Sequence, residues 1–307
     1  MRNIYKHLKN QRGSATIIIA LCMTVLLGFT ALVIDVGVIT SEKSRISNAA
    51  DAAALAGAQE LIINNSNAIN VANQYLEKNG VDPMEAEIVV SDSDTKISVS
   101  INTEVDYYFA RVLGFDKGIV ETEAVAICAP VIGVYEGLRP FAIEQQTLNF
   151  EETYTLKEGG GSGSNGNYGG LALGGNGAST YVSNIIDGYN GYLRVGDFVD
   201  TEPGNMSGPT AQGINTLISH CTHTPQCTYN RYDNDCPRII TVIMVETLDV
   251  NGRSEVKIVG FAKFFLIGVA GQGRNSIVTG KFIRTIMTGE LGETHTDFGL
   301  KGVKLIK

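Results

Sequence analysis

The segment HCTHTPQCTYNRYDNDC, residues 220–236, gathers two histidines, three cysteines and two aspartates within 17 residues. Thiolate and imidazole groups are zinc ligands, and a Cys–His pair can also act as a nucleophile with its base. The spacing lacks the paired C-x₂-C pattern of zinc modules, and a second cysteine six residues from the first favours oxidation over catalysis. The residues leave a zinc site, a nucleophilic pair, free thiols and disulfides open.

Disulfides are the first expectation if this segment is exported, because oxidising compartments preserve them. Cys22 lies in an apolar run and is expected to be a small apolar residue. The remaining cysteines are even in number and allow three pairings. The candidate disulfide residues are Cys128, Cys221, Cys227 and Cys236.

A second polar segment, GDFVDTEPGNMSGPT at residues 196–210, concentrates oxygen donors that calcium uses as ligands. It lacks the spacing of an EF-hand loop, and its Pro-Gly and Gly-Pro pairs favour a tight polar loop instead. No nucleophile elbow, phosphate-binding loop, dinucleotide fingerprint or His-Glu-x-x-His motif occurs in the chain. The sequence therefore predicts no catalytic residue, no metal ligand and no cofactor, and a protein that is not an enzyme.

An apolar run near the N-terminus bears on the compartment in which these side chains lie. Residues 13–34 contain no charged side chain, and a helix of 22 residues spans roughly the 30 Å of a bilayer's hydrocarbon core. A secretory signal is shorter and ends in a cleavage site, whereas this run continues into a helical pattern. The sequence therefore predicts a retained membrane anchor. Val256–Ala270 is too often interrupted by lysine to be a second span and is expected to be a buried strand.

Charge predicts the orientation of this anchor. Residues 1–12 carry four basic side chains and no acid, so the positive-inside rule places them in the cytoplasm and the rest outside. The chain beyond residue 12 has 20 basic and 32 acidic residues. That excess of acid argues against nucleic acid as a partner.

The residues after the anchor, SEKSRISNAADAAALAGAQEL, form a small-residue helix pattern. Alanine favours helix, so the membrane helix is expected to continue without a break. Residues four apart form two adjacent ridges that allow close approach of another element. That element is either the same chain's folded part or another subunit. The expected helix-packing face consists of Ala49, Ala50, Ala53, Ala54, Gly57 and Ala58.

This N-terminal region resembles the Flp pilus-assembly TadE/TadG-like family of the tight-adherence system. The resemblance is carried by Arg12-Gly13, the apolar run, Asp35 with Gly37, Arg45 and NAADAAALAGA at residues 48–58. It is strong over the first 60 residues and weak to about residue 130. It implies a membrane-anchored, pilin-like accessory component.

Two departures from related patterns matter. A prepilin-type cut between Gly13 and Ser14 would put Ile18 where pilins carry a glutamate, so the resemblance does not carry processing or fibre incorporation with it. Some TadG-like proteins carry a metal-dependent adhesion site, Asp-x-Ser-x-Ser. The segment at residues 91–98, SDSDTKIS, has the wrong spacing for it and fits a hairpin turn.

The expected fold class is α+β, with a long N-terminal transmembrane helix, a small α+β module and a mainly antiparallel β-rich C-terminal module. The spacing of Ile69, Ala72 and Leu76 predicts a helix near residues 68–79, and residues 105–114 also have a helical rhythm. Asn251-Gly252 between two apolar runs predicts a hairpin. The glycine-rich stretch 159–177 fits an ordered loop or a linker. The predicted organisation is a cytoplasmic segment 1–12, a span 13–39, a TadE/TadG-like module 40–130, a connector at 130–140 and a Gly-rich, β-rich extracytoplasmic module 138–307.

The function predicted from these features is assembly or presentation of a tight-adherence pilus by a single-pass protein whose N-terminus is cytoplasmic. Expected partners are membrane lipid, pilin or other Tad pilus-assembly subunits, and further copies of the chain, with no nucleic acid. The alternative is a membrane-tethered surface hydrolase or a metal-binding adhesive module that uses the cluster at 220–236. An enzyme should show a buried polar constellation in a cleft, whereas an adaptor should show an open apolar or aromatic patch.

Overall fold

The computed structural model describes residues 12–91, 94–157, 169–204, 206–270 and 276–307. The chain divides into two compact units. The first comprises α1 to Gly57, residues 65–126 and the last three residues, and the second comprises residues 58–64 and 127–304. The long N-terminal helix followed by a sheet-rich region confirms the predicted fold class, with both parallel and antiparallel strand pairs.

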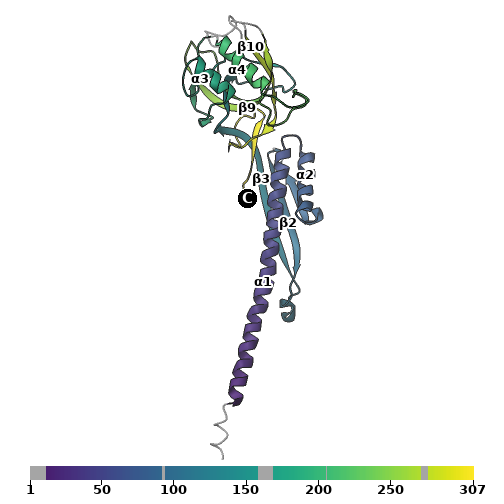
Figure 1. The fold of residues 1–307 in the computed structure, drawn as a ribbon. Coiled ribbons are helices and arrows are strands. Elements are labelled where there is room, and N and C mark those ends of the chain that lie inside the picture. The colour runs from purple at the N-terminus through teal and green to yellow at the C-terminus, as the bar shows by residue number, and fades with distance from the viewer. Residues whose placement is uncertain (1–11, 92–93, 158–168, 205, 271–275) are drawn as a thin grey trace, which may run out of the picture. The chain divides into compact units, whose positions relative to one another are not determined.

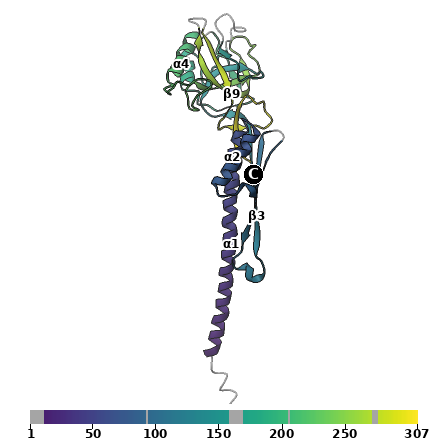
Figure 2. The same ribbon diagram turned by 90° about the vertical axis from the view of Figure 1, so that its right-hand side faces the viewer.

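The first unit is built on a single long helix. Its elements are α1 (Arg12–Glu60), α2 (Asn65–Lys78), η1 (Pro83–Glu85), β1 (Ala86–Val90), β2 (Lys96–Asp106), η2 (Ala110–Leu113) and the first part of β3 (Lys117–Val134). Figures 1 and 2 show β2 and β3 running alongside α1, whose N-terminal part continues beyond the sheet. β1 and β2 pair antiparallel, as the alternating apolar residues predicted.

Two details of this unit differ from expectation. In α2 the buried residues are Ala68, Ala72 and Leu76, whereas Ile69 lies on the exposed side. The predicted helical rhythm over 105–114 is wrong, because β2 continues to Asp106 and only a 3₁₀ turn, η2, follows. Large apolar residues in this turn are exposed, so their spacing does not record a buried helix face.

The second unit is organised around a six-stranded sheet. Its central order is β4-β8-β9-β10-β5, and β7 also pairs with β9. Its elements are β4 (Leu138–Glu144), β5 (Tyr154–Lys157), α3 (Ala178–Ile186), β6 (Leu193–Arg194), β7 (Phe198–Asp200), α4 (Ser207–Ser219), β8 (Ile239–Val245), β9 (Glu255–Ala270), β10 (Ile277–Ile283), β11 (Thr285–Ile286), β12 (Glu290–Leu291) and β13 (Leu300–Leu305).

Both faces of the six-stranded sheet are buried. Ile240 and Val242 of β8 join a cluster with Ile185 of α3 and Ile214 of α4, while Ile243 faces a second cluster. Burial on both faces explains why β8 reads as a continuous apolar run without polar alternation. β8 and β9 pair antiparallel across Asn251-Gly252, as predicted. β9 confirms that residues 256–270 form a strand, which is largely buried as far as Leu266 and more exposed beyond it.

The helices α3 and α4 were not predicted. Gly208 and Pro209 were expected to form a turn, but they lie in the first turn of α4. Proline is tolerated there because the first backbone N–H groups of a helix have no intrahelical partner. β3 also runs on to Val134, so the expected connector over 130–140 is reduced to the residues before β4 begins at Leu138.

Candidate functional site

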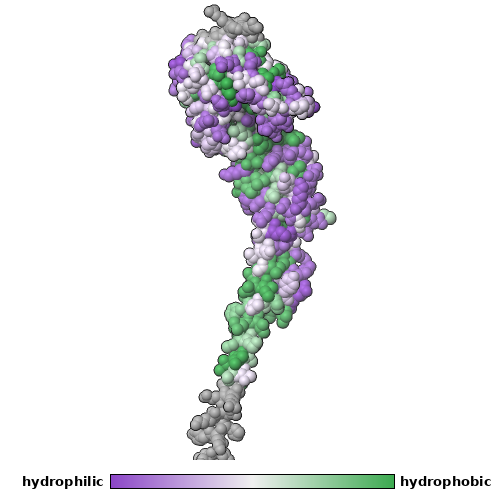
Figure 3. Space-filling view, in the orientation of Figure 1, coloured by the Kyte–Doolittle hydropathy of each residue, from purple (hydrophilic) through white to green (hydrophobic). Residues whose placement is uncertain are grey.

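The N-terminal half of α1 is apolar around its whole circumference. The large apolar side chains from Ile17 to Val36 are between 40% and 69% exposed. Figure 3 shows this stretch as a largely green segment below the sheet. A helix without a polar face is stable only when apolar surroundings cover it. Within the described residues, α1 is the one helix long and apolar enough to cross a membrane.

One face of the C-terminal half of α1 is packed inside the chain. The side chains of Ala49, Ala50, Ala53 and Ala54 have no solvent exposure. A Cβ added at Gly57 would lie 2.6 Å from Ile97 Cδ1 of β2 and 3.2 Å from Ala72 Cβ of α2. The small residues therefore allow β2 and α2 to approach α1 closely. This agrees with packing against the same chain, and it leaves those positions no surface for docking another subunit.

Asp35, which interrupts the apolar run, has a defined structural partner. Its carboxylate accepts hydrogen bonds from the backbone N–H groups of Tyr108 (2.8 Å), Phe109 (3.1 Å) and Ala110 (2.7 Å). These amides begin the turn η2 and would otherwise lack acceptors. Asp35 is itself 5% exposed, so its charge is satisfied by the loop between β2 and β3.

Arg45 makes a second connection from α1. Its guanidinium forms a two-point ion pair with Glu42, at 2.9 and 2.5 Å, and donates to the carbonyl oxygen of Gly80 beyond α2. Hydrogen bonding to Glu42 raises the pKa of Arg45, and the same contact lowers the pKa of Glu42. Asp35, Arg45 and the alanines of the sequence pattern therefore all hold the first unit together.

The loop between β2 and β3 exposes a group of large apolar side chains. We call residues 107–116 the tip loop. Its large exposed side chains are between 45% and 86% exposed, and they are Tyr108, Phe109, Val112, Leu113 and Phe115. Sequence reasoning missed this surface because the apolar spacing was assigned to a helix.

Three of the four candidate disulfide cysteines come together in the second unit. Four potential metal-ligand atoms lie within 4.8 Å of one another, and they come one each from Cys221, His223, Cys227 and Cys236. The sulfur atoms of Cys221 and Cys236 are 3.5 Å apart, and Cys221 Sγ is 3.7 Å from His223 Nδ1. Cys128 lies on β3 outside this group. All five cysteines of the chain, each within the described residues, are free, so the predicted disulfide stays a prediction.

The cysteine environments differ in their effect on ionisation. Burial opposes ionisation of Cys221, but hydrogen bonds from the backbone of Cys227 and from His223 lower its pKa to about 6. Burial raises the pKa of Cys236 to about 12 and that of Cys128 to about 11. His223 has a raised pKa through its contact with Cys221, and its Nε2 lies 3.4 Å from both Asp233 and Asp235.

The oxygen donors of the segment 196–210 serve the fold. Asp197 accepts the backbone N–H of Arg194 in a turn, and Thr201 hydroxyl donates to the carbonyl of Gly252. Glu202 is buried and accepts the backbone N–H of Gly177. Asn205 lies outside the described residues. Asp197, Thr201 and Glu202 thus each take part in contacts within the chain.

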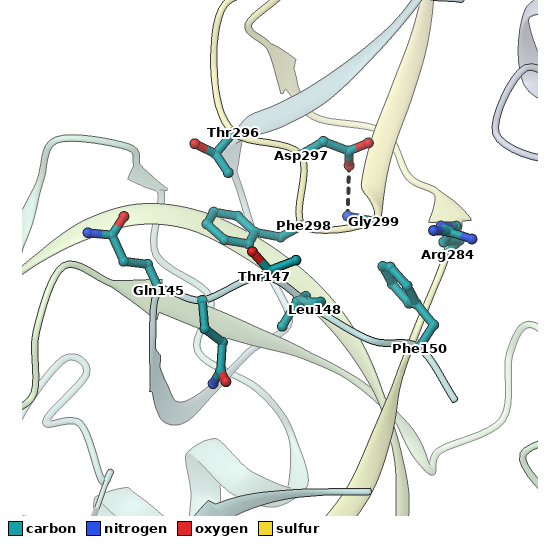
Figure 4. A pocket seen from close by; sticks show the side chains of 10 residues that line it. Gln145, Thr147, Leu148, Phe150, Arg284, Thr296, Asp297, Phe298 and Gly299 are labelled. Atoms are coloured by element: carbon teal, nitrogen blue, oxygen red, sulfur yellow. Dashed lines mark hydrogen bonds between the residues drawn. The ribbon is translucent and has the colours of Figure 1, made fainter. Parts of the chain in front are cut away.

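A pocket of about 490 Å³ lies in the second unit, between the segment after β4 and the segment before β13 (Figure 4). Its charged side chains are Arg284, whose guanidinium stacks on the ring of Phe150, and Asp297, which accepts the backbone N–H of Gly299. Asp297 also pairs with Lys301 at 3.0 Å. The two charged groups are thus occupied by structural contacts, and the described lining contains no nucleophile–base pair.

Two candidate processing residues, Gly13 and Ser14, lie at the beginning of α1. Cleavage between them stays a prediction. The basic segment at residues 1–11 lies outside the described residues.

These observations define a class of protein: a candidate single-helix membrane anchor joined to a sheet-rich C-terminal region. Residues 13–60 match the Tad family model, described as "Putative Flp pilus-assembly TadE/G-like". The matched region coincides with α1, and it supports an involvement in Flp/Tad pilus assembly. No curated protein and no solved structure matches the chain.

Proposed function

We propose that the chain is a single-pass accessory protein that anchors to the cytoplasmic membrane and supports assembly or presentation of a tight-adherence pilus. The observation that carries this proposal is the exposed apolar half of α1 within the region matched by the Tad family model. A pilus-assembly component of this kind needs a membrane helix and a folded part that can reach other subunits.

The basic residues at the N-terminus favour its placement in the cytoplasm, so the second unit would lie on the extracytoplasmic side of the membrane. Its role would be geometric, as an adaptor, cap or adhesive head. The assembly partners would be pilin, other Tad subunits or further copies of the chain. Because Ala49, Ala50, Ala53, Ala54 and Gly57 are covered by their own chain, these partners would contact other surfaces, such as the N-terminal half of α1 within the membrane.

The hydrolase alternative has less support. The pocket lacks a nucleophile–base pair among its described residues, and its two charged side chains, Arg284 and Asp297, are engaged in contacts with neighbouring residues.

Deletion of the gene and complementation in the native host would test the proposal. Loss of surface pili on deletion, and recovery with the wild-type chain, are the expected results. Normal pilus numbers in a strain that lacks the chain would contradict it. A chain carrying Cys128→Ser, whose side chain is buried in β3 and belongs to neither exposed apolar surface, serves as a control that should restore pili.

A further inference from the structure

The cysteine cluster of the second unit has the geometry of a metal site. We propose that Cys221, His223, Cys227 and Cys236 bind one zinc ion. In tetrahedral coordination, ordinary zinc–ligand distances put two sulfurs about 3.8 Å apart and a sulfur and a nitrogen about 3.6 Å apart. The corresponding separations here are 3.5 Å for Cys221–Cys236 and 3.7 Å for Cys221–His223.

The choice of zinc follows from the ligand types. Three thiolates and one imidazole in tetrahedral arrangement suit zinc, whereas magnesium and calcium require oxygen ligands. Binding converts each thiol to a thiolate, so up to three protons leave for solvent as the metal enters. The charge of the resulting site is −1, and the buried guanidinium of Arg238 lies beside it, donating to the carbonyl oxygen of Cys227 at 2.8 Å.

The surroundings of the cluster resemble the support that metal ligands require. His223 turns Nδ1 toward Cys221, while Nε2 lies 3.4 Å from carboxylate oxygens of Asp233 and Asp235. A carboxylate at the second ring nitrogen fixes the orientation of a ligating histidine. Backbone hydrogen bonds reach Cys221 from Cys227 and Cys236 from Arg238.

A disulfide explains fewer of these contacts than a metal. A bridge between two of the three cysteines would leave the third thiol unpaired, and it would give His223 and its two acids no role. Cys227 and Cys236 are each 2% exposed and pack with Phe265 and Ile283. A zinc ion would use all four residues and fasten the segment between α4 and β8, which the structure leaves almost without regular elements.

Metal analysis of the full chain in detergent, purified without chelator or added reductant, tests this proposal. We expect about one zinc per wild-type chain, loss of most zinc in Cys236→Ser, and full retention in Cys128→Ser. Because a cluster variant could unfold, alkylation of the wild-type chain supplies a second reading. The three cluster thiols should resist alkylation until a strong chelator removes the metal.

Several results would overturn the zinc site. These are zinc well below one per chain, iron in its place, equal zinc in Cys236→Ser, or a disulfide within the cluster in most molecules by non-reducing peptide mapping. Thiols that alkylate equally with and without chelator would also contradict it.

A separate observation concerns the tip loop of the first unit. We infer that the tip loop enters the interfacial layer of the same membrane that α1 spans, an inference that rests on the proposed anchor. The three hydrogen bonds to Asp35 hold this loop against α1 at the end of its apolar run. The loop's exposed side chains are therefore at the depth where the helix leaves the hydrocarbon core.

The composition of the tip loop fits that depth. Tyr108, Phe109 and Phe115 place aromatic rings beside Val112 and Leu113, all of them exposed. Aromatic side chains are enriched where a bilayer meets water. Asp35 holds the loop beside the exposed side chains of Ile34 and Val36 on α1, so a lipid bilayer is the occupant we assign to it. Covering these side chains with lipid removes the cost of exposing them to water.

The absence of tryptophan from the chain makes a direct test available. Leu113→Trp, Met84→Trp and Phe29→Trp are each reconstituted as full chains in vesicles containing brominated lipid. Phe29 lies in the anchor, and Met84 is 93% exposed elsewhere in the first unit. We expect strong quenching at Phe29→Trp, clear quenching at Leu113→Trp and little at Met84→Trp.

The three positions separate two failures. Quenching at Phe29→Trp with Leu113→Trp no more quenched than Met84→Trp would overturn the tip-loop inference and leave the anchor standing, with a protein partner as the occupant instead. No quenching at Phe29→Trp would overturn the anchor and the tip-loop inference together.

Discussion

The two halves of α1 belong to one continuous helix but meet different surroundings. Between Ile17 and Val36 the large apolar side chains are exposed, whereas Ala49, Ala50, Ala53, Ala54 and Gly57 are small and buried. The positions compared carry no charged or polar side chain in either half. The difference lies in size: bulky side chains offer area to a fluid apolar medium, while small ones let a sheet and a second helix come close to the backbone.

Charged side chains in the N-terminal half of α1 should prevent membrane insertion. Replacing Leu21 and Phe29 together with arginine should remove the chain from the membrane fraction, because each arginine costs about 2.5–3.5 kcal/mol on insertion scales. Fractionation followed by immunoblotting measures this effect. Ile63→Arg, at an exposed position outside the apolar run, should leave the distribution unchanged. Membrane retention of the double variant would refute the anchor.

Larger side chains in the C-terminal half of α1 should lower the stability of the first unit, and two glycines of the helix allow a matched comparison. A side chain at Gly57 meets Ile97, Ala68 and Ala72, whereas a Cβ at Gly28 meets nothing within 4 Å. We expect Gly57→Leu to destabilise the first unit by about 1–3 kcal/mol or more through overpacking. Gly28→Leu should be neutral or slightly stabilising because leucine favours helix.

Thermal unfolding in detergent compares the two variants directly. Equal melting temperatures would mean that the buried half does not pack as described. Normal stability of Gly57→Leu combined with lost pilus assembly would instead favour the earlier hypothesis that this ridge docks other subunits.

Asp35 marks the boundary between the halves, and its removal has a smaller and local effect. Asp35→Ala leaves the N–H groups of residues 108–110 without their acceptor, and hydrogen bonds to charged groups contribute about 1.5–3 kcal/mol. Hydrogen exchange at these amides should become faster, while α2 amides keep their protection. Asp35→Asn, which retains one oxygen, should give an intermediate result. Unchanged exchange in Asp35→Ala would contradict the assigned contact.

The sequence was sufficient for features that depend on local pattern. The length of the apolar run predicted α1, and alternation predicted the β1–β2 pair. Asn251-Gly252 between two apolar runs predicted the β8–β9 pair. It was insufficient where the partner decides the outcome. The alanine spacing could not distinguish a sister subunit from the chain's own β2 and α2, because small residues serve either contact equally well.

Features formed by distant segments were also out of reach. The apolar spacing of residues 105–114 suggested a helix. In the structure, Asp35, more than 70 residues earlier, accepts hydrogen bonds from the backbone of this loop, and the large apolar side chains of the loop are exposed. The cysteine cluster was visible as a candidate, but its irregular spacing gave no geometry. Only the fold shows three sulfurs and an imidazole nitrogen converging while Cys128 stays on another strand.

The orientation of the chain tests the central claim most directly, because the proposed function requires the second unit to lie on the extracytoplasmic side of the membrane. A C-terminal tag is followed in intact protoplasts treated with protease, beside a cytoplasmic control protein. The account predicts that the tag is removed while the control survives. Survival of both, with loss of the tag only after the protoplasts are broken, would place the second unit in the cytoplasm and contradict it.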